Sequence, residues 1–285
     1  MILRLFKWAA VIIVGLYSLA LAYVATNQRS MLYCPSTSTS TPSALGLANV
    51  EDARIQTSDG ETLRAWFKAP EQHKPVFLFF GGQGASLGLE GWRYQVIEKA
   101  GYGFLFLAYR GYEGSTGEPS ERGLELDSLA AYDWLHKRVE GDRIIAHGFS
   151  LGSGVAVWLA TQRPLRALIL ESPFTAAVDV AAERMPYFPV RLVMQDQFLS
   201  RDRIGNVHAP VFIATGKRDG TYPSEHGVKL YSLAREPKAL FLSADAGHSD
   251  LIEYGLYDRI WAFLDAHPPT TNAGGAGSPS VTRSR

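Results

Sequence analysis

The chain has 285 residues, of which 46% are hydrophobic, and its 28 basic and 28 acidic residues give a formal net charge of zero. This length and apolar content suit one large domain with a sizeable core. The charge balance gives no electrostatic basis for binding nucleic acid or an acidic partner, and the single cysteine, Cys34, excludes an intrachain disulfide and a thiolate metal cluster.

Residues 1–29 predict an N-terminal transmembrane anchor. Residues 8–26 read WAAVIIVGLYSLALAYVAT and carry no charge, and about 20 apolar residues are needed to cross the hydrocarbon core as a helix. Arg4 and Lys7 predict a cytoplasmic N-terminus, with the rest of the chain on the opposite side of the membrane. The alternatives are a signal peptide cleaved after Ala20-Leu21-Ala22, although the apolar run continues past that site, and a buried core helix.

Polar segments flank the expected domain on both sides. Residues 30–49 include PSTSTSTPSALGLAN, which predicts a Ser/Thr/Pro-rich linker that buries little and tethers the domain to the membrane. Residues 267–285, HPPTTNAGGAGSPSVTRSR, have the composition of a disordered tail. A folded domain is therefore expected over residues 50–266. Cys34 is interpreted as an unmodified thiol, with acylation near the membrane as the alternative.

Within residues 50–266, apolar runs alternate with amphipathic segments. Residues 54–56 and 62–68 flank Ser58-Asp59-Gly60 and predict a β-hairpin. Six apolar runs that suit buried strands follow, at 76–80, 104–109, 143–147, 167–170, 211–215 and 239–242. Helical patterns lie between and after them, at 92–100, 122–138, 151–163, 224–234 and 251–266. This alternation predicts an α/β fold with a mostly parallel, doubly wound sheet and an antiparallel start.

The stretch GFSLG at residues 148–152 fits the G-x-S-x-G pattern of a nucleophile elbow. It lies between an expected strand and an expected helix, which is the context that gives the pattern its meaning. The two glycines leave room for a sharp turn, whose central residue projects above the carboxyl edge of the sheet with a helix N-terminus behind it. Ser150 is therefore the predicted nucleophile, and the alternative is a small residue in a tight turn.

A serine hydroxyl is a poor nucleophile until a histidine, oriented by a carboxylate, takes its proton. Of the seven histidines, His248 is the best candidate, because it follows the last expected strand and its loop opens on the same sheet edge as Ser150. Asp219 follows the strand at 211–215 and completes the chain order Ser, Asp, His, so it is the predicted acid. The alternative acids are Glu171, Asp179, Asp245 and Asp250.

A glycine-rich loop after the strand at 76–80 predicts an oxyanion hole. The loop reads Gly81-Gly82-Gln83-Gly84-Ala85-Ser86, and glycines let backbone N–H groups point at a carbonyl oxygen. The predicted donors are the backbone N–H groups of Gln83 and of Leu151, the residue after the serine. A phosphate-binding loop is the alternative, but the loop lacks the GK[ST] ending of a P-loop.

Together these motifs resemble those of the α/β-hydrolase superfamily over nearly all of residues 50–266. The chain looks most like the short-capped, membrane-anchored branch that includes the bud-emergence-related proteins and the abhydrolase-domain serine hydrolases. The resemblance rests on AYRGYEGSTGEPSERGLELDSLAAYDWL (108–135), GFSLGSGVA (148–156), ESPFTAAVDVA (171–181), GKRDGTYP (216–223) and AGHSDL (246–251). It implies Ser150 as nucleophile, Asp219 as acid and His248 as base. The branch usually carries His-Gly-Asn where this chain carries Gly81-Gly82-Gln83.

The expected activity is two-step acyl transfer by a serine hydrolase of the esterase or thioesterase type, with no metal or organic cofactor. About forty residues between the strands at 167–170 and 211–215 leave room for a small helical flap, and a lightly covered apolar mouth beside a bilayer suits acyl esters or thioesters of amphiphiles. The expected partners are this small-molecule substrate and the lipid bilayer, with no nucleic acid. A peptidase or amidase with the same triad is one alternative, and a non-catalytic membrane-tethered scaffold of the same fold is another.

Overall fold

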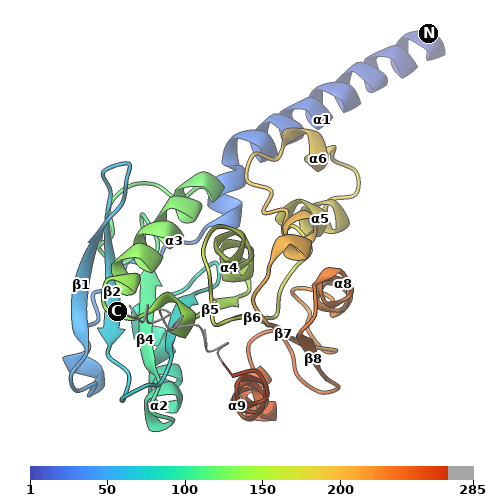
Figure 1. Ribbon diagram of the computed structural model, residues 1–285. Coiled ribbons are helices and arrows are strands. Elements are labelled where there is room, and N and C mark those ends of the chain that lie inside the picture. The colour runs from blue at the N-terminus through green and yellow to red at the C-terminus, as the bar shows by residue number, and fades with distance from the viewer. Residues whose placement is uncertain (269–285) are drawn as a thin grey trace, which may run out of the picture.

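An eight-stranded sheet forms the centre of residues 1–268, the part of the chain that the computed structural model describes (Figure 1). Its order is β1-β2-β4-β3-β5-β6-β7-β8, with bounds Glu51–Gln56 for β1, Thr62–Lys68 for β2, Val76–Phe80 for β3, Gly103–Ala108 for β4, Ile144–Phe149 for β5, Ala167–Glu171 for β6, Val211–Gly216 for β7 and Lys238–Ser243 for β8. The pairs β1–β2 and β2–β4 are antiparallel and the other five pairs are parallel. The predicted mostly parallel sheet with an antiparallel start is confirmed.

Helices cover both faces of this sheet. Figure 1 shows α2 (Gly91–Lys99) and α9 (Leu256–Ala266) on one face, and α3 (Glu121–His136), α4 (Leu151–Gln162) and α8 (Glu225–Leu233) on the other. Helix α4 is apolar around most of its circumference because it packs between α3 and the strands β5 and β6. The helix expected at 251–266 is interrupted, since Gly255 has a φ of 84° and ends a short 3-10 turn before α9 begins.

A short flap connects β6 to β7 and contains α5 (Ala177–Arg184), α6 (Val190–Val193) and α7 (Ser200–Arg203). Each of these helices has at most eight residues. The cap over the carboxyl edge of the sheet is therefore small, as the length of this connection predicted.

Helix α1 (Ile2–Leu32) projects away from the sheet, and the C-terminal part of α1 lies beside the flap (Figure 1). Its 31 residues correspond to about 46 Å, and its most apolar window has a mean hydropathy of 2.1 with none of that window buried. Within residues 1–268, it is the one helix long and apolar enough to cross a membrane, judged by length and composition. Arg29, near the end of α1, forms a salt bridge of 2.9 Å with Asp196 of the flap.

Residues 33–49, here called the connecting segment, lie against the domain. Tyr33 is 2% exposed, although the composition of this stretch predicted little burial. The backbone N–H of Cys34 donates to the carbonyl of Gln83, and the Arg64 guanidinium donates to the Ser40 carbonyl at 2.6 Å. Hydrogen bonds to residues distant in the sequence therefore hold the connecting segment on the domain, although its composition is that of a loose linker. The tail expected at 267–285 lies, apart from its first two residues, outside the described residues.

Candidate active site

Ser150 occupies the turn between β5 and α4, and its φ of 52° is strained for a residue with a side chain. Its backbone N–H donates to the Glu171 carbonyl at 2.9 Å, which ties the turn to the neighbouring strand β6. Glycine is required on both sides of it. A Cβ on Gly148 would lie 2.4 Å from the Gly152 carbonyl oxygen, and one on Gly152 would lie 2.0 Å from the Phe80 carbonyl oxygen.

The crowding at Gly152 gives a prediction. Gly152→Ala is expected to destabilise the fold by about 1–3 kcal/mol, because the methyl group has to displace the backbone at the end of β3. Gly84→Ala, in the loop that follows β3, is the matched control, since no atom lies within 4 Å of its added Cβ. Urea unfolding of both variants measures the difference, and equal midpoints would show that the turn has room for a methyl group.

His248 lies between Ser150 and Asp219 and makes a hydrogen bond to each. The distance from His248 Nε2 to Ser150 Oγ is 2.9 Å, and that from His248 Nδ1 to Asp219 Oδ2 is 2.8 Å. The Asp219 side chain has no exposed surface. Its other oxygen accepts the backbone N–H groups of Thr221 and Tyr222, both at 2.7 Å. The carboxylate is therefore held in one orientation, with one oxygen reserved for the imidazole.

The backbone and ring of His248 are also fixed by neighbours. The Ser172 hydroxyl donates to the His248 carbonyl oxygen at 2.8 Å. The Tyr222 ring meets the imidazole edge-on, with centroids 5.0 Å apart, and the Phe149 ring lies 5.4 Å away on centroids. This support holds the imidazole between the serine and the aspartate.

The four alternative acids have other partners. Glu171 is buried in a salt bridge with Arg93, 2.8 Å long, and Asp179 pairs with Arg191 and Arg201 of the flap. Asp245 forms an exposed salt bridge with Arg218, and Asp250 accepts the backbone N–H of Gly247 at 2.6 Å. Asp219 is the one of these five carboxylates that is hydrogen-bonded to His248 in the described part of the chain.

The glycine-rich loop after β3 lies directly beside the serine. A Cβ on Gly82 would be 3.3 Å from the Ser150 Cβ, so the loop backbone is close to the hydroxyl. Within the described residues, the backbone N–H groups of Gln83 and Leu151 donate to no protein acceptor. They are therefore available to an oxygen atom bound at Ser150.

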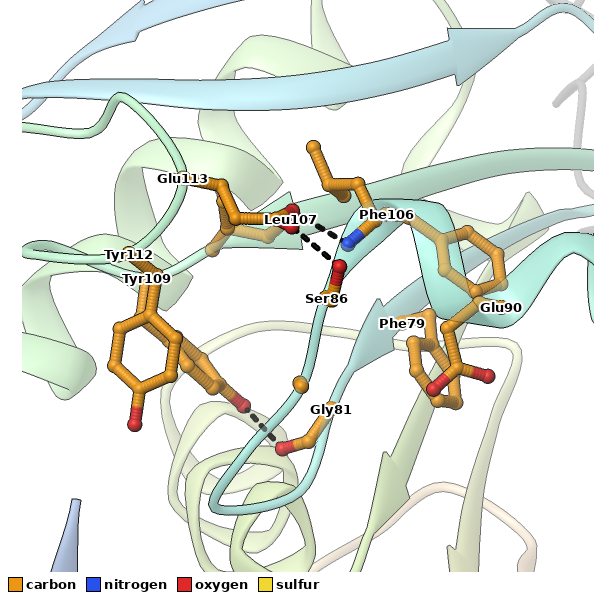
Figure 2. A pocket seen from close by; sticks show the side chains of 12 residues that line it. Phe79, Gly81, Ser86, Glu90, Phe106, Leu107, Tyr109, Tyr112 and Glu113 are labelled. Carbon is orange, nitrogen blue, oxygen red and sulfur yellow. Dashed lines mark hydrogen bonds between the residues drawn. The ribbon is translucent and has the colours of Figure 1, made fainter. Parts of the chain in front are cut away.

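Three side chains of residues 109–113 support this loop, and sequence reasoning assigned them no role. The Tyr109 hydroxyl donates to the Gly81 carbonyl at 3.1 Å, and the Tyr112 hydroxyl donates to the Gln83 carbonyl at 2.7 Å. Figure 2 shows the first of these bonds together with Glu113, whose carboxylate accepts the Ser86 hydroxyl and the backbone N–H of Leu87. The signal for them was present in the sequence, because AYRGYEG belongs to the longest motif of the family resemblance.

Burial keeps the two phenols of this support in their donor role. It raises the pKa of the Tyr109 hydroxyl well above its ordinary value, and desolvation likewise raises the pKa of Tyr112. Both phenols therefore remain protonated donors at neutral pH. Glu113 is only 4% exposed, and its backbone N–H donates to the Ser36 carbonyl, which joins the connecting segment to the same support.

An open pocket of about 300 Å³ lies in front of the serine. Its lining includes Ser150, His248, Gln83 and Tyr222. Such a pocket admits a small acyl group to the hydroxyl from the solvent side. No group of three or more His, Cys, Asp or Glu side chains within residues 1–268 is placed to hold a metal ion.

Comparisons with known proteins agree on the fold. The α/β-hydrolase domain-containing protein WAV2 of Arabidopsis thaliana is 32% identical over 266 residues, which cover 83% of this chain and 86% of that protein. The lysophosphatidylserine lipase ABHD12 of Danio rerio is 32% identical over 206 residues, covering 65% of this chain and 53% of that protein. No protein-family model matches the chain.

Solved structures give the same architecture. An esterase of Pyrococcus furiosus superposes with a TM-score of 0.68 at 21% identity, covering 82% of this chain and 97% of that one. At this identity the likeness shows the fold alone. Together with the similarity to WAV2 along most of both sequences, it establishes that the chain belongs to the α/β-hydrolase superfamily.

Proposed function

We propose that this protein is a membrane-anchored serine hydrolase that cleaves carboxylic esters or thioesters with lipid-like acyl chains. The observation that carries the proposal is the hydrogen-bonded series from Asp219 through His248 to Ser150, with distances of 2.8 and 2.9 Å. Its serine lies in a strained turn at the N-terminus of α4, where the helix dipole favours negative charge. This arrangement has the geometry of an activated nucleophile.

The reaction proceeds in two steps. His248 removes the hydroxyl proton as the Ser150 oxygen attacks the carbonyl carbon, while Asp219 stabilises the imidazolium that forms. The backbone N–H groups of Gln83 and Leu151 bind the oxyanion of the tetrahedral intermediate. His248 then gives the proton to the leaving alcohol or thiol, and water, activated by the same imidazole, releases the acid. No cofactor enters either step.

The substrate class follows from what surrounds the pocket. Helix α1 is apolar and unburied, and the flap beside it exposes Tyr187 and Leu192, which are 87% and 86% exposed. Exposed apolar side chains next to an apolar helix suit contact with a bilayer. The similarity to an enzyme named as a lysophosphatidylserine lipase agrees with an amphiphilic ester.

The apolar helix α1 supports a protein with one membrane span. Arg4 and Lys7 precede the apolar stretch, so the N-terminus is cytoplasmic and the hydrolase domain lies on the opposite side. In sealed vesicles whose outer surface carries the hydrolase domain, added protease should digest the domain and leave a reporter fused to the N-terminus intact.

Labelling with a fluorophosphonate probe tests the proposal, because the probe reacts with an activated serine. The wild-type membrane fraction should be labelled, and Ser150→Ala should abolish the labelling. Ser153→Ala is the matched control, since Ser153 lies one turn further along α4 and is fully buried. Absence of labelling in folded wild type would support a non-catalytic scaffold. Labelling combined with turnover of amides but not esters would support a peptidase or amidase.

A further inference from the structure

A second cavity, of about 180 Å³, lies between α1 and the flap. One wall comes from the C-terminal third of α1 and includes Val24, Ala25 and Met31. The facing wall comes from α5, α6 and the residue after α6, and includes Ala181, Val190 and Met194. Aliphatic and thioether side chains dominate both walls, so this space favours a flexible apolar ligand over a polar one.

The cavity adjoins the pocket at the serine. Gln83 and Tyr222 line both spaces, and no other residue is shared by the two linings. Tyr222 also contacts the imidazole of His248 edge-on. These two side chains therefore form the boundary between a reactive polar pocket and an apolar cavity.

Contacts between α1 and the flap give the cavity a defined shape. The Gln28 side chain accepts the backbone N–H of Gln195 at 2.7 Å and donates to the Val193 carbonyl at 3.3 Å. Nearer the N-terminus of α1, the Tyr17 ring stacks on Phe188 with centroids 5.5 Å apart. Polar contacts at one end and an aromatic pair at the other hold the two walls apart at a fixed spacing.

We propose that this cavity binds the acyl chain of the substrate, so that the anchor helix itself forms part of the substrate site. This inference rests on the proposed function, since it places the ester carbonyl at Ser150 and the chain past Gln83 and Tyr222. An acyl chain suits the cavity better than a second protein segment, because the cavity is small, about 180 Å³, and adjoins the pocket of the reactive serine. The flap that lines the cavity also exposes Tyr187 and Leu192, next to the unburied apolar surface of α1. In a bilayer, lipid would lie against these surfaces, beside the cavity.

The dependence of rate on chain length tests this directly. Each methylene group that enters an apolar site raises kcat/KM about three- to four-fold. For the full-length protein in phosphatidylcholine nanodiscs, kcat/KM for p-nitrophenyl esters should therefore rise from the butyrate to the decanoate or beyond. A flat profile in wild type would overturn the inference.

Two variants fill the cavity from opposite walls. Ala25→Trp on α1 and Ala181→Trp on α5 are each expected to lower the ratio of palmitate to butyrate turnover at least ten-fold. Ala22→Trp, an exposed position three residues earlier on α1 that does not line the cavity, is the matched control and should leave the ratio unchanged. Fluorophosphonate labelling of each variant reports whether the serine site is folded.

The outcomes separate the inference from the function on which it rests. Normal butyrate turnover with the wild-type ratio in both cavity variants would refute the acyl-chain site and leave the hydrolase intact. An equal drop in Ala22→Trp would likewise refute it, since the effect would then come from α1 in the bilayer. Absence of both labelling and ester turnover in wild type would refute the proposed function and the cavity assignment together.

Discussion

His248→Ala is expected to lower kcat for a short-chain ester by about 10⁶-fold, with a smaller change in KM. Without the imidazole, no hydrogen-bonded base within residues 1–268 takes the proton of Ser150 Oγ as it attacks. The residual rate comes from substrate binding and from the oxyanion donors, which the substitution leaves in place. Steady-state kinetics with p-nitrophenyl butyrate measure the effect.

Asp219→Asn should cost less, about 10⁴-fold in kcat. The amide is close in size to the carboxylate and still meets His248 Nδ1, but it does not stabilise the imidazolium and favours the wrong tautomer. Asp245→Asn is the matched control, because Asp245 lies in the loop of His248 yet forms an exposed salt bridge with Arg218. A large loss in Asp245→Asn and a small one in Asp219→Asn would reverse the assignment of the acid.

The second large effect concerns stability and lies beneath the serine turn. Glu171→Gln is expected to lower the free energy of unfolding by about 3 kcal/mol, because the buried Arg93 guanidinium loses the closer of its two carboxylate partners and keeps only Glu90. The Arg93 side chain is 3% exposed and the Glu171 side chain 1%, and the distance from Arg93 Nη1 to Glu171 Oε2 is 2.8 Å. His147 does not compensate, since burial lowers its pKa and keeps the imidazole neutral. Denaturant unfolding of the full-length chain in detergent measures the change.

An exposed pair in the same domain is the control. Asp133 and Arg163 form a salt bridge of 3.0 Å with side chains 50% and 33% exposed, so Asp133→Asn should change the free energy of unfolding by no more than about 1 kcal/mol. Equal effects of the two substitutions would show that burial does not govern the strength of the Arg93–Glu171 pair.

The pH dependence of stability gives an independent measure of the same pair. Burial alone would raise the pKa of Glu171, but the Arg93 charge and the hydrogen bond from His147 lower it to about 2, against an ordinary value of 4.5. The carboxylate therefore stabilises the folded state above pH 4.5, and this stabilisation is lost as the pH falls from 4.5 toward 2. In Glu171→Gln, this part of the acid sensitivity should be absent.

The sequence predicted the elements around Ser150, Asp219 and His248 because each of these residues directly follows a short apolar strand. Parallel strands place their carboxyl ends on one edge of a sheet, so three positions far apart in the chain could be expected at one place. Ends of elements differed by at most three residues, as between the strand expected at 143–147 and the observed Ile144–Phe149, except for the helix expected at 251–266, which begins at Leu256. A run of apolar residues predicts the middle of a strand well, but it does not predict the residue at which the last ladder hydrogen bond forms.

What the sequence did not predict depends on contacts between distant segments. Tyr112 and Glu113 lie in a polar loop whose composition gives no reason to expect burial, and Tyr109 ends an expected strand with no sign of a partner, yet the three side chains hold the backbone at Gly81–Leu87. The connecting segment likewise has the composition of a tether. Its burial at Tyr33 depends on surface that the rest of the chain supplies. Neither arrangement has a periodicity that could reveal it.

The contact between Gln83 and the end of α1 has a consequence for how the protein meets its substrate. The Gln83 side-chain amide donates to the Met31 carbonyl at 2.8 Å, and the Gln83 backbone carbonyl accepts the backbone N–H of Cys34. No free hinge separates the anchor from the reactive serine. Under the proposed function, α1 in a bilayer would hold the site at one height above the lipid surface. Turnover would then follow the mole fraction of substrate in that leaflet, which arrives by lateral diffusion, and not its concentration in bulk water.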